Sequence, residues 1–367
     1  MQSPYSAFDH RCMARAIQLA EATVPFSQPN PAVGCVIALD GRVVGEGNTQ
    51  PAGQAHAEVM ALQAAGHHAQ GATAYVSLEP CCTQGRTGPC TDALAAAGIA
   101  RVVYAIDDPN PAVDGAGANA LRAAGIQVQS GLMAAAAKAP VRGFHSRFTR
   151  GRPWLTLKMA SSLDGAIAMR SGESQWITSP EARADVQHFR ARHAAILTGI
   201  GTVLADDPAL TVRDPRYAGL SRQPLRVIAD GRARTPSDAQ VLTQDEQVLV
   251  VAAQETPAPV HLASVFATVP ANDDGLLDLA ALLNLLAARD INSVWAECGP
   301  ALAGALLATG LVDTLICYLA PRALGSDSQS MFTTPGWQRL ADGVAFAFDD
   351  VRHVGPDLRL TLSPRYP

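Results

Sequence analysis

The chain has 367 residues, of which 48% are hydrophobic and 17% are charged, so it can bury two cores and disorder is not expected. Its net charge is −5 and no basic run occurs, which argues against a nucleic-acid partner, because a phosphate backbone attracts a basic surface. The first residues, M-Q-S-P-Y-S-A-F-D-H-R, lack the apolar run of a signal peptide.

No membrane span and no disulfide framework are expected either. The longest apolar tract, residues 276–288, is interrupted by Asp278 and Asn284, whereas a spanning helix needs about 20 apolar residues. Seven cysteines, an odd number, favour thiols and metal ligation over disulfides. These features together predict a cytoplasmic protein without a membrane partner.

The first predicted domain, residues 1–146, alternates helices with strands. Ser6 and Asp9 have capping-box character before a helix that Asn30-Pro31 should end. Asp40-Gly41 lies between two apolar runs and predicts a hairpin turn. The next expected elements are a helix at 57–65, a strand at 72–78, a helix at 91–97, a strand at 102–106, a helix at 119–124 and a strand at 126–128. This order is typical of a sheet with helices on both faces.

One histidine and two cysteines in this domain indicate a metal site. H-A-E ends at Glu58, P-C ends at Cys81, and Cys90 follows nine positions later. The imidazole of His56 and two thiolates suit Zn²⁺, and three protein ligands leave one tetrahedral position open, as in catalytic sites. A water bound there loses its proton near neutral pH. In zinc nucleobase deaminases the glutamate of H-x-E carries protons and does not bind metal, which predicts that role for Glu58.

This site imposes conditions on the local structure. Residues two apart on a helix point in nearly opposite directions, so His56 and Glu58 can share a site only if His56 lies at or before the first turn. Cys90 is expected to begin a helix, whose N-terminus would stabilise its thiolate. Cys82 is expected to be a free thiol outside the site, because only one of two adjacent cysteines normally has the reach and direction to ligate.

Residues 134–152 are expected to link the two domains. The Ala-rich stretch at 134–139 ends at Pro140, and residues 141–152 contain arginines but no acidic residue. Two interpretations of the arginine-rich part stay open. It is either a solvated connector or a contact for a phosphorylated substrate.

The second predicted domain, residues 147–367, again alternates strands and helices. A strand at 154–160 contains Lys158, which must reach a cleft or an edge because unpaired burial is costly. Ser179-Pro180 predicts the start of a helix that runs to about Arg192. Further strands are expected at 195–198, 225–229, 248–252, 294–297, 315–319, 344–348 and 358–362, with helices at 277–288 and 301–309.

The turn E-C-G-P at 297–300 separates a predicted strand from a predicted helix. Glycine lets a ligand approach the backbone, and free amides at a helix N-terminus can hold a pyrophosphate. The turn differs from the Rossmann fingerprint, and most strand-glycine-helix turns bind nothing, so by itself it indicates little.

Longer motifs resemble the bifunctional deaminase/reductase family of riboflavin biosynthesis over nearly the whole chain. In the first domain they are P-N-P-A-V-G-C-V-I (29–37), G-A-T-A-Y-V-S-L-E-P-C (71–81) and C-C-T-Q-G-R-T-G-P-C (81–90). In the second they are K-M-A-S-S-L-D-G (158–165), G-E-S-Q-W-I-T (172–178), T-V-L-A-D-D-P-A-L-T-V-R (202–213) and E-C-G-P-A-L-A (297–303).

The resemblance implies an α/β protein with an N-terminal cytidine-deaminase-like three-layer α/β/α domain and a C-terminal dihydrofolate-reductase-like α/β domain. It implies Zn²⁺ and NADPH as cofactors and a homo-oligomer, either a dimer or a tetramer. The implied substrate is 2,5-diamino-6-(5-phosphoribosylamino)pyrimidin-4(3H)-one, attacked by zinc-bound hydroxide at its amino-bearing C2 carbon. NADPH then reduces C1′ of the ring-opened ribose, giving 5-amino-6-(5-phosphoribitylamino)uracil.

Position by position, the resemblance assigns residues to three ligands. It makes His56, Cys81 and Cys90 the metal ligands and Glu58 the catalytic residue. It assigns to the nicotinamide cofactor Ala160, Trp176, Thr202, Asp206, Gly299, Pro300, Ala301, Leu302, Ala303, Gly304 and Ala305. It assigns to the substrate Ser174, Arg190, Leu210, Arg213 and Glu297, and we expect Asn30 and Lys158 to lie near the substrate as well.

Three of these assignments have structural alternatives. The bidentate forks of Arg190 and Arg213 suit a phosphate, but the two residues could equally be a surface helix charge and a loop salt bridge. Glu297 could accept hydrogen bonds from the ribose or the ring nitrogens, or it could only cap the next helix.

The chain departs from the family pattern at a few positions. Cys82-Thr83-Gln84 stand where the family usually has serine and two polar or aromatic residues, often histidines. Gln28 stands where histidine is frequent, and Gly231 replaces a side chain that the family sometimes offers to the cofactor. These departures concern substrate and cofactor contacts, not the metal.

Two other functions are considered. One is a nucleic-acid base deaminase with an accessory domain, against which the acidic charge and the motifs of the second domain argue. The other is a chain in which only one half is active. The sequence carries the motifs of both halves, but turnover cannot be read from it.

Overall fold

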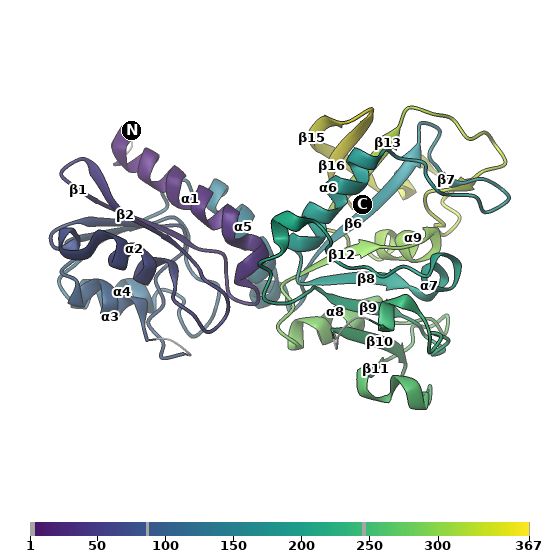
Figure 1. The fold of residues 1–367 in the computed structure, drawn as a ribbon, viewed down its shortest axis with the longest axis horizontal. Helices are drawn as coiled ribbons and strands as arrows, with labels where there is room; N and C mark the ends of the chain where they lie inside the picture. Colours follow the sequence, from purple (N-terminus) through teal and green to yellow (C-terminus); the bar gives the residue numbers. More distant parts are fainter. Residues whose placement is uncertain (1–3, 86–87, 244–246, 367) are drawn as a thin grey trace. The chain divides into compact units, whose positions relative to one another are not determined.

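The computed structural model describes residues 4–85, 88–243 and 247–366, and it divides between Gly151 and Arg152 into two compact units. In Figure 1 the first unit runs from purple to blue and the second from teal to yellow. No helix in the part of the chain that the structure describes is both long and apolar enough to cross a membrane.

The first unit is a five-stranded sheet covered by helices on both faces. The strand order is β2 (Arg42–Asn48), β1 (Gly34–Leu39), β3 (Thr73–Val76), β4 (Arg101–Tyr104) and β5 (Gln127–Ser130). On one face lie α1 (Ala7–Ser27) and α5 (Ala134–Arg150), and on the other lie α2 (Ala57–Ala65), α3 (Cys90–Ala96) and α4 (Ala116–Ala123) (Figure 1). The predicted three-layer architecture is confirmed.

Local sequence signals set the starts and turns of these elements. The side chain of Ser6 accepts from the backbone of Asp9, and Asp9 accepts from the backbone of Ser6, so the predicted capping box begins α1. Asp40 and Gly41 both have positive φ and close the predicted β1–β2 hairpin. Helix α2 has the predicted bounds, because Gly66 ends it in a conformation that glycine adopts easily.

Small residues bring the helices close to the sheet. A Cβ added to Gly34 would lie 2.0 Å from the carbonyl oxygen of Ala16 on α1, and one added to Gly47 would lie 2.3 Å from that of Ala57 on α2. The backbone at the start of α2 therefore rests directly on strand β2, and this contact fixes the position of the preceding residue, His56.

The expected link at 134–152 is wrong for most of its length. Residues 134–150 form helix α5, which continues through Pro140 and packs against α1. Its buried residues include Ala137, Val141 and Phe144. Burial of this apolar face offsets the helix-breaking effect of the proline. Most of the arginine-rich stretch is therefore part of a packed helix and not a connector.

The second unit contains a nine-stranded sheet. Seven parallel strands come in the order β11 (Phe266–Val269), β10 (Val248–Ala253), β9 (Leu225–Ala229), β8 (Ala195–Gly199), β12 (Ser293–Glu297), β6 (Trp154–Ser162) and β13 (Thr314–Ala320). The antiparallel strands β16 (Asp357–Arg365) and β15 (Ala345–Val354) complete one edge.

Helices cover both faces of this sheet. The core on one face includes side chains of α8 (Leu279–Ala288) and α9 (Pro300–Ala308). The core on the other face includes side chains of α6 (Pro180–Arg192) and α7 (Ile200–Asp206). The predicted α/β class is confirmed for this unit as well.

Some short elements of the second unit were not predicted. A two-stranded sheet pairs β7 (Ala166–Ala168) with β14 (Gln329–Ser330), and β11 is a four-residue edge strand. The strands β7 and β14, with three and two residues, are too short for a period-2 pattern to stand out.

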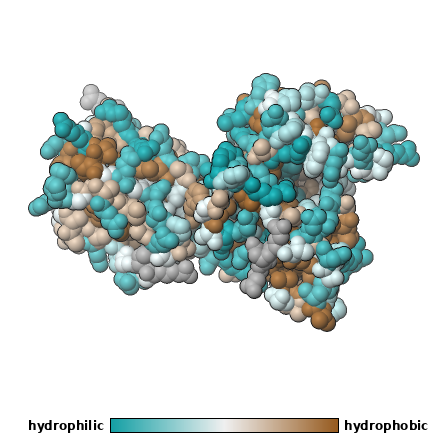
Figure 2. Space-filling model, viewed as in Figure 1, coloured by the Kyte–Doolittle hydropathy of each residue, from teal (hydrophilic) through white to brown (hydrophobic). Residues whose placement is uncertain are grey.

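Seen in Figure 2, both units have a mostly hydrophilic surface with separate apolar areas. Among the exposed large apolar side chains are Val43 on β2 and Val260 just before β11. Single exposed apolar residues are ordinary for a folded protein, so they define no particular surface.

Candidate active sites

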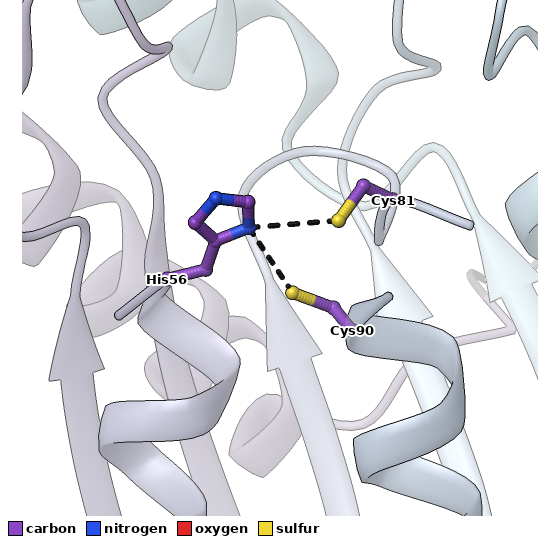
Figure 3. Close-up of side chains that lie close together, drawn as sticks. All are labelled: His56, Cys81 and Cys90. Carbon is purple, nitrogen blue, oxygen red and sulfur yellow. Dashed lines mark hydrogen bonds between the residues drawn. The ribbon is translucent and has the colours of Figure 1, made fainter. Parts of the chain in front are cut away.

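The structure brings His56, Cys81 and Cys90 together from three separate elements. His56 is the N-cap of α2, with extended backbone, Cys81 follows β3, and Cys90 is the first residue of α3. One ligand atom from each lies within 4.8 Å of the other two. Figure 3 shows the imidazole facing both sulfur atoms.

The distances fit a zinc ion. Nδ1 of His56 lies 3.3 Å from Sγ of Cys90 and 3.5 Å from Sγ of Cys81. A tetrahedral zinc ion with usual bond lengths would separate a nitrogen and a sulfur ligand by about 3.6 Å. One imidazole and two thiols are also donors that zinc prefers, and with three protein ligands one coordination position stays open.

The surroundings favour a thiolate at this group. Hydrogen bonds from Cys90 and His56 lower the pKa of the Cys81 thiol, although burial opposes that change. Since metal ligation requires the deprotonated sulfur, the shift at Cys81 acts in the direction that metal binding needs. The hydrogen bond to Cys81 and burial raise the pKa of the Cys90 thiol, which is opposite to the shift expected from its place at the N-terminus of α3.

Glu58 lies beside this group and is only 4% exposed. His56 is the N-cap of α2 and lies outside the helix, so its side chain can point to the same site as that of Glu58, as the sequence analysis required. Burial and the nearby Cys81 raise the pKa of Glu58 to about 7. A carboxyl group with such a pKa can accept and return a proton near neutral pH.

Other predicted residues of this unit lie outside the three-residue group. Asn30 is in the turn after α1, where its amide donates to the carbonyl of Ser27. Cys82 is half-buried, and burial raises the pKa of its thiol. Two residues of the loop between the cysteines, Arg86 and Thr87, lie outside the described residues.

In the second unit the candidate residues gather where parallel strands end. Ligands of such sheets bind beyond the carboxyl ends of the strands. Glu297 ends β12 and is paired in register with Lys158 on the neighbouring β6, while Ala160 follows on the same strand. Helix α7 begins directly after β8 at this edge.

Arg190 and Glu297, both assigned to the substrate, bind each other. Nε of Arg190 lies 2.5 Å from Oε1 of Glu297, and Nη2 lies 2.9 Å from Oε2. Nη1 of Arg190 donates to the carbonyl of Thr211 at 3.0 Å. Arg190 is 8% exposed, so it is neither the surface charge considered as an alternative nor a freely available cation.

Glu297 is held in its ionised form. Burial raises its pKa, but Arg190, Lys158 and a hydrogen bond from Trp295 outweigh this effect and lower the pKa to about 2. The indole nitrogen of Trp295 donates to Oε1 of Glu297 at 2.8 Å. The sequence reasoning missed Trp295, although residues two apart on a strand point to the same face.

Lys158 lies close to the same ion pair. Burial lowers the pKa of the Lys158 ammonium group, and the negative charge of Glu297 offsets part of this shift. The lysine therefore has the acidic neighbour that its place in an apolar strand required.

The turn before α9 is tied to α7. The amide of Gly299, the N-cap of α9, donates to Oγ1 of Thr202 at 3.1 Å. Ala303 and Gly304 are buried, and a Cβ on Gly304 would lie 1.9 Å from the carbonyl oxygen of Thr333. Within the predicted cofactor segment, these two residues pack against the protein, whereas Ala301 is exposed.

The remaining predicted residues are in loops or at element ends. Trp176 is 61% exposed, with the guanidinium of Arg183 4.4 Å from its ring centre. Ser174 is half-buried, and Pro300, Leu302 and Ala305 belong to α9. Asp206 is the exposed last residue of α7, Leu210 is buried with positive φ, and the backbone amide of the exposed Arg213 donates to Gln187.

Comparison with known proteins agrees with this division. Residues 6–106 match the cytidine and deoxycytidylate deaminase zinc-binding region, and residues 153–360 match the RibD C-terminal domain. The fold and the two groups of residues therefore define a two-part enzyme, a zinc-dependent deaminase joined to an NADPH-dependent reductase.

Full-length relatives share both parts. The riboflavin biosynthesis protein RibD of Escherichia coli K12 is 50% identical, with 96% of this chain and 99% of the relative covered. A structure of Acinetobacter baumannii RibD has a TM-score of 0.90 at 42% identity, covering 98% of this chain and 99% of that chain. A Thermotoga maritima structure has a TM-score of 0.84 at 31% identity, with the same coverage.

The chain belongs to the RibD family of bifunctional riboflavin-biosynthesis enzymes. The predicted family, fold class, bifunctional activity, zinc and NADPH are thereby confirmed. The alternative of a nucleic-acid base deaminase with an accessory domain is not supported, because the second unit matches the RibD C-terminal domain.

Proposed function

We propose that the first unit deaminates 2,5-diamino-6-(5-phosphoribosylamino)pyrimidin-4(3H)-one and that the second reduces the product to 5-amino-6-(5-phosphoribitylamino)uracil. The Thermotoga maritima relative is described as a diaminohydroxyphosphoribosylaminopyrimidine deaminase and 5-amino-6-(5-phosphoribosylamino)uracil reductase. The observation that carries the proposal is the group of His56, Cys81 and Cys90 beside a buried carboxyl group.

In the deamination, His56, Cys81 and Cys90 hold the metal. Zinc in such a site acidifies a water molecule. Glu58 would take a proton from the attacking water and return protons to the ring and to the leaving amino group. The C2–N bond breaks, ammonia leaves, and the carbon keeps the water oxygen. The pKa of Glu58 near 7 suits both directions of proton transfer. Asn30 is proposed to contact the pyrimidine.

In the reduction, the second unit orients two ligands. NADPH would supply a hydride to C1′ of the open-chain ribose, whose C1′=N double bond becomes a single bond as the nitrogen takes a proton from water. Glu297 and Lys158 lie side by side on β12 and β6 and bind the sugar and ring polar groups. Arg190 holds Glu297 through two hydrogen bonds, and the exposed Arg213 is the better placed of the two arginines to bind the phosphate. Ser174 and Leu210 are proposed as further substrate contacts.

The cofactor is proposed to bind along the strand ends next to α7 and α9. Thr202 and Gly299 join these two helices, and Asp206 is the last residue of α7. Ala160 on β6 and Trp176 are proposed as further cofactor contacts. Since Ala303 and Gly304 are buried, the first turn of α9 is the part of the 299–305 segment with which the cofactor would make contact.

We further propose that the functional domains coincide with the two structural units, which divide at Gly151 instead of residue 146. A cytoplasmic location and a dimer or tetramer are also proposed, with the family relationship as their support. Light scattering on the purified protein measures the oligomeric state, and a monomeric mass would contradict an oligomer.

His56→Ala tests the assignment of the first site. It should abolish ammonia release and zinc retention but leave NADPH oxidation on the deaminated intermediate unchanged. His67→Ala, at an exposed position of the same unit, is the matched control and should behave as wild type. Loss of both activities in His56→Ala would contradict two independent sites, and retained ammonia release would refute His56 as a ligand. NADPH oxidation by the wild-type protein also tests whether both halves are active.

A further inference from the structure

Glu79 lies two residues before Cys81, and none of the roles described above uses its side chain. It is 2% exposed, in the turn between β3 and the first cysteine. Its carboxylate accepts three backbone N–H groups. Oε2 accepts from Asp108 at 3.3 Å and from Gly115 at 3.0 Å, and Oε1 accepts from Ala118 at 2.9 Å.

Two of these donors belong to the start of α4. Gly115 is the N-cap of that helix and Ala118 lies in its first turn. The first amides of a helix have no partner within the helix, and its dipole favours a negative charge at this end. Glu79 therefore caps α4 from a distant part of the chain, and the third bond fixes the loop that contains Asp108.

The backbone on both sides of Glu79 is held as well. The amide of Glu79 donates to the carbonyl of Ile106 at 2.9 Å, and the carbonyl of Cys81 accepts from Thr91 on α3 at 3.2 Å. A Cβ on Gly117 of α4 would lie 2.1 Å from the carbonyl oxygen of Pro80, so the first turn of α4 rests directly on this segment. Residues 79–81 are thus attached to the end of β4, to α4 and to α3.

We propose that Glu79 is a positioning residue of the metal site, which holds Cys81 at the distance from His56 and Cys90 that a zinc ion needs. Only Pro80 separates Glu79 from Cys81, and its ring fixes φ, so the position of Glu79 is transmitted to the cysteine with little freedom. The inference rests on the proposed metal ligands. Residues that orient metal ligands affect metal affinity although they do not touch the metal.

The three donors explain why a carboxylate is needed. An ionised carboxylate only accepts, with two oxygens available to three N–H groups. A glutamine would direct its own NH₂ group at one or two of these amides, so at least one donor would lose its partner. An aspartate is shorter by one methylene group and cannot reach all three donors from the same backbone position.

Glu79→Gln in the full-length zinc-loaded protein tests the proposal, with Glu46→Gln as the matched control. Glu46 is a surface carboxylate of the same unit, paired with Arg15 at 2.7 Å. We expect Glu79→Gln to lower zinc affinity, measured by competition with a chromophoric chelator, by about 10- to 100-fold. The kcat for ammonia release should fall and recover partly in excess zinc, while NADPH oxidation on the deaminated intermediate stays at the wild-type value. Glu46→Gln should change none of these.

A folded Glu79→Gln protein with wild-type zinc affinity and kcat would overturn the proposal. A lower melting temperature of the zinc-free protein without a change in zinc affinity would do the same, because it would show a purely structural role. If Glu79→Gln does not fold, Gly117→Ala displaces residues 79–81 from the α4 side, because its added Cβ would meet the carbonyl oxygen of Pro80. Wild-type zinc affinity in Gly117→Ala would contradict the proposal. Zinc retention by Cys81→Ala would instead refute the ligand assignment, independently of Glu79.

Discussion

At the scale of single residues, the carboxyl end of β12 in the second unit is organised by paired charges. Arg190 and Glu297 are both largely buried and form two hydrogen bonds, with Trp295 as a further donor. Arg190 and Arg213 were both expected to bind the phosphate, but the guanidinium of Arg190 already forms an ion pair with Glu297. The residue type shows that Arg190 is charged. Only the packed structure shows that its partner is Glu297.

Glu297→Gln should destabilise the second unit by about 3–5 kcal/mol, because Arg190 would remain buried without its counter-charge. In the wild-type protein, the folded-state pKa of Glu297, about 2, lies below the unfolded value of about 4.3. Glu297 therefore contributes stability that is fully present above the unfolded pKa and is lost as the pH falls through the folded pKa. Urea unfolding of wild type and variant between pH 5 and pH 2 measures this, and the variant should show the weaker pH dependence. Equal slopes would contradict the assignment.

Cys81 and Cys82 provide a comparison between adjacent thiols. Cys81 is one of the three grouped residues and Cys82 is not. Cys81→Ser should lose zinc and ammonia release, while Cys82→Ser should keep the metal content of the wild type and most of its activity. Metal analysis of the purified variants together with an ammonia assay distinguishes them. Zinc loss from Cys82→Ser would mean that the wrong thiol has been assigned.

At the scale of elements, the first site depends on where two helices begin. His56 precedes α2 and Cys90 starts α3, so both residues of the group lie at helix N-termini. The bounds of α2 and α6 follow from local signals, namely Gly66 after one helix and Ser179-Pro180 before the other. Helix α5 was missed because Pro140 is a strong local signal, and its effect is overcome by packing against a helix far away in sequence.

Gly47→Ala should displace the start of α2 and with it His56. The added Cβ would meet the carbonyl oxygen of Ala57 at 2.3 Å and the amide of Ala61 at 2.5 Å. Overpacking of this kind costs about 1–3 kcal/mol. We expect a lower melting temperature and weaker zinc binding. Gly336→Ala, where an added Cβ meets nothing within 4 Å, is the control. Unchanged zinc affinity in a stable Gly47→Ala protein would show that the contact does not position the histidine.

At the scale of the whole molecule, two units with separate cores carry the two activities. Each unit has its own group of candidate residues, and each unit matches a different family model. The fold therefore explains how two unrelated reactions occur on one chain, because the residues of each group belong to a single unit.

Ligands should accordingly stabilise the units one at a time. A ligand that binds only the folded state raises stability by mass action, by about 2.7 kcal/mol at a concentration 100 times its Kd. In calorimetry, a zinc chelator should lower the transition of the first unit and leave that of the second in place, while NADPH should raise only the second. A single transition that responds to both ligands would contradict independent units.

The sequence by itself determined the fold class, the family, which histidine and cysteines lie together, and the starts of several helices. These features depend on local chemistry, such as caps, turn residues and ligand types in long motifs, which can be read without knowing what lies nearby. Only the tertiary structure decided that Arg190 binds Glu297, that Trp295 supports it, that residues 134–150 form a helix, and that Glu79 caps α4. Most of these features depend on contacts between residues that are far apart in the chain. The free energy gained by burying such contacts selects them, and no short stretch of sequence reveals it.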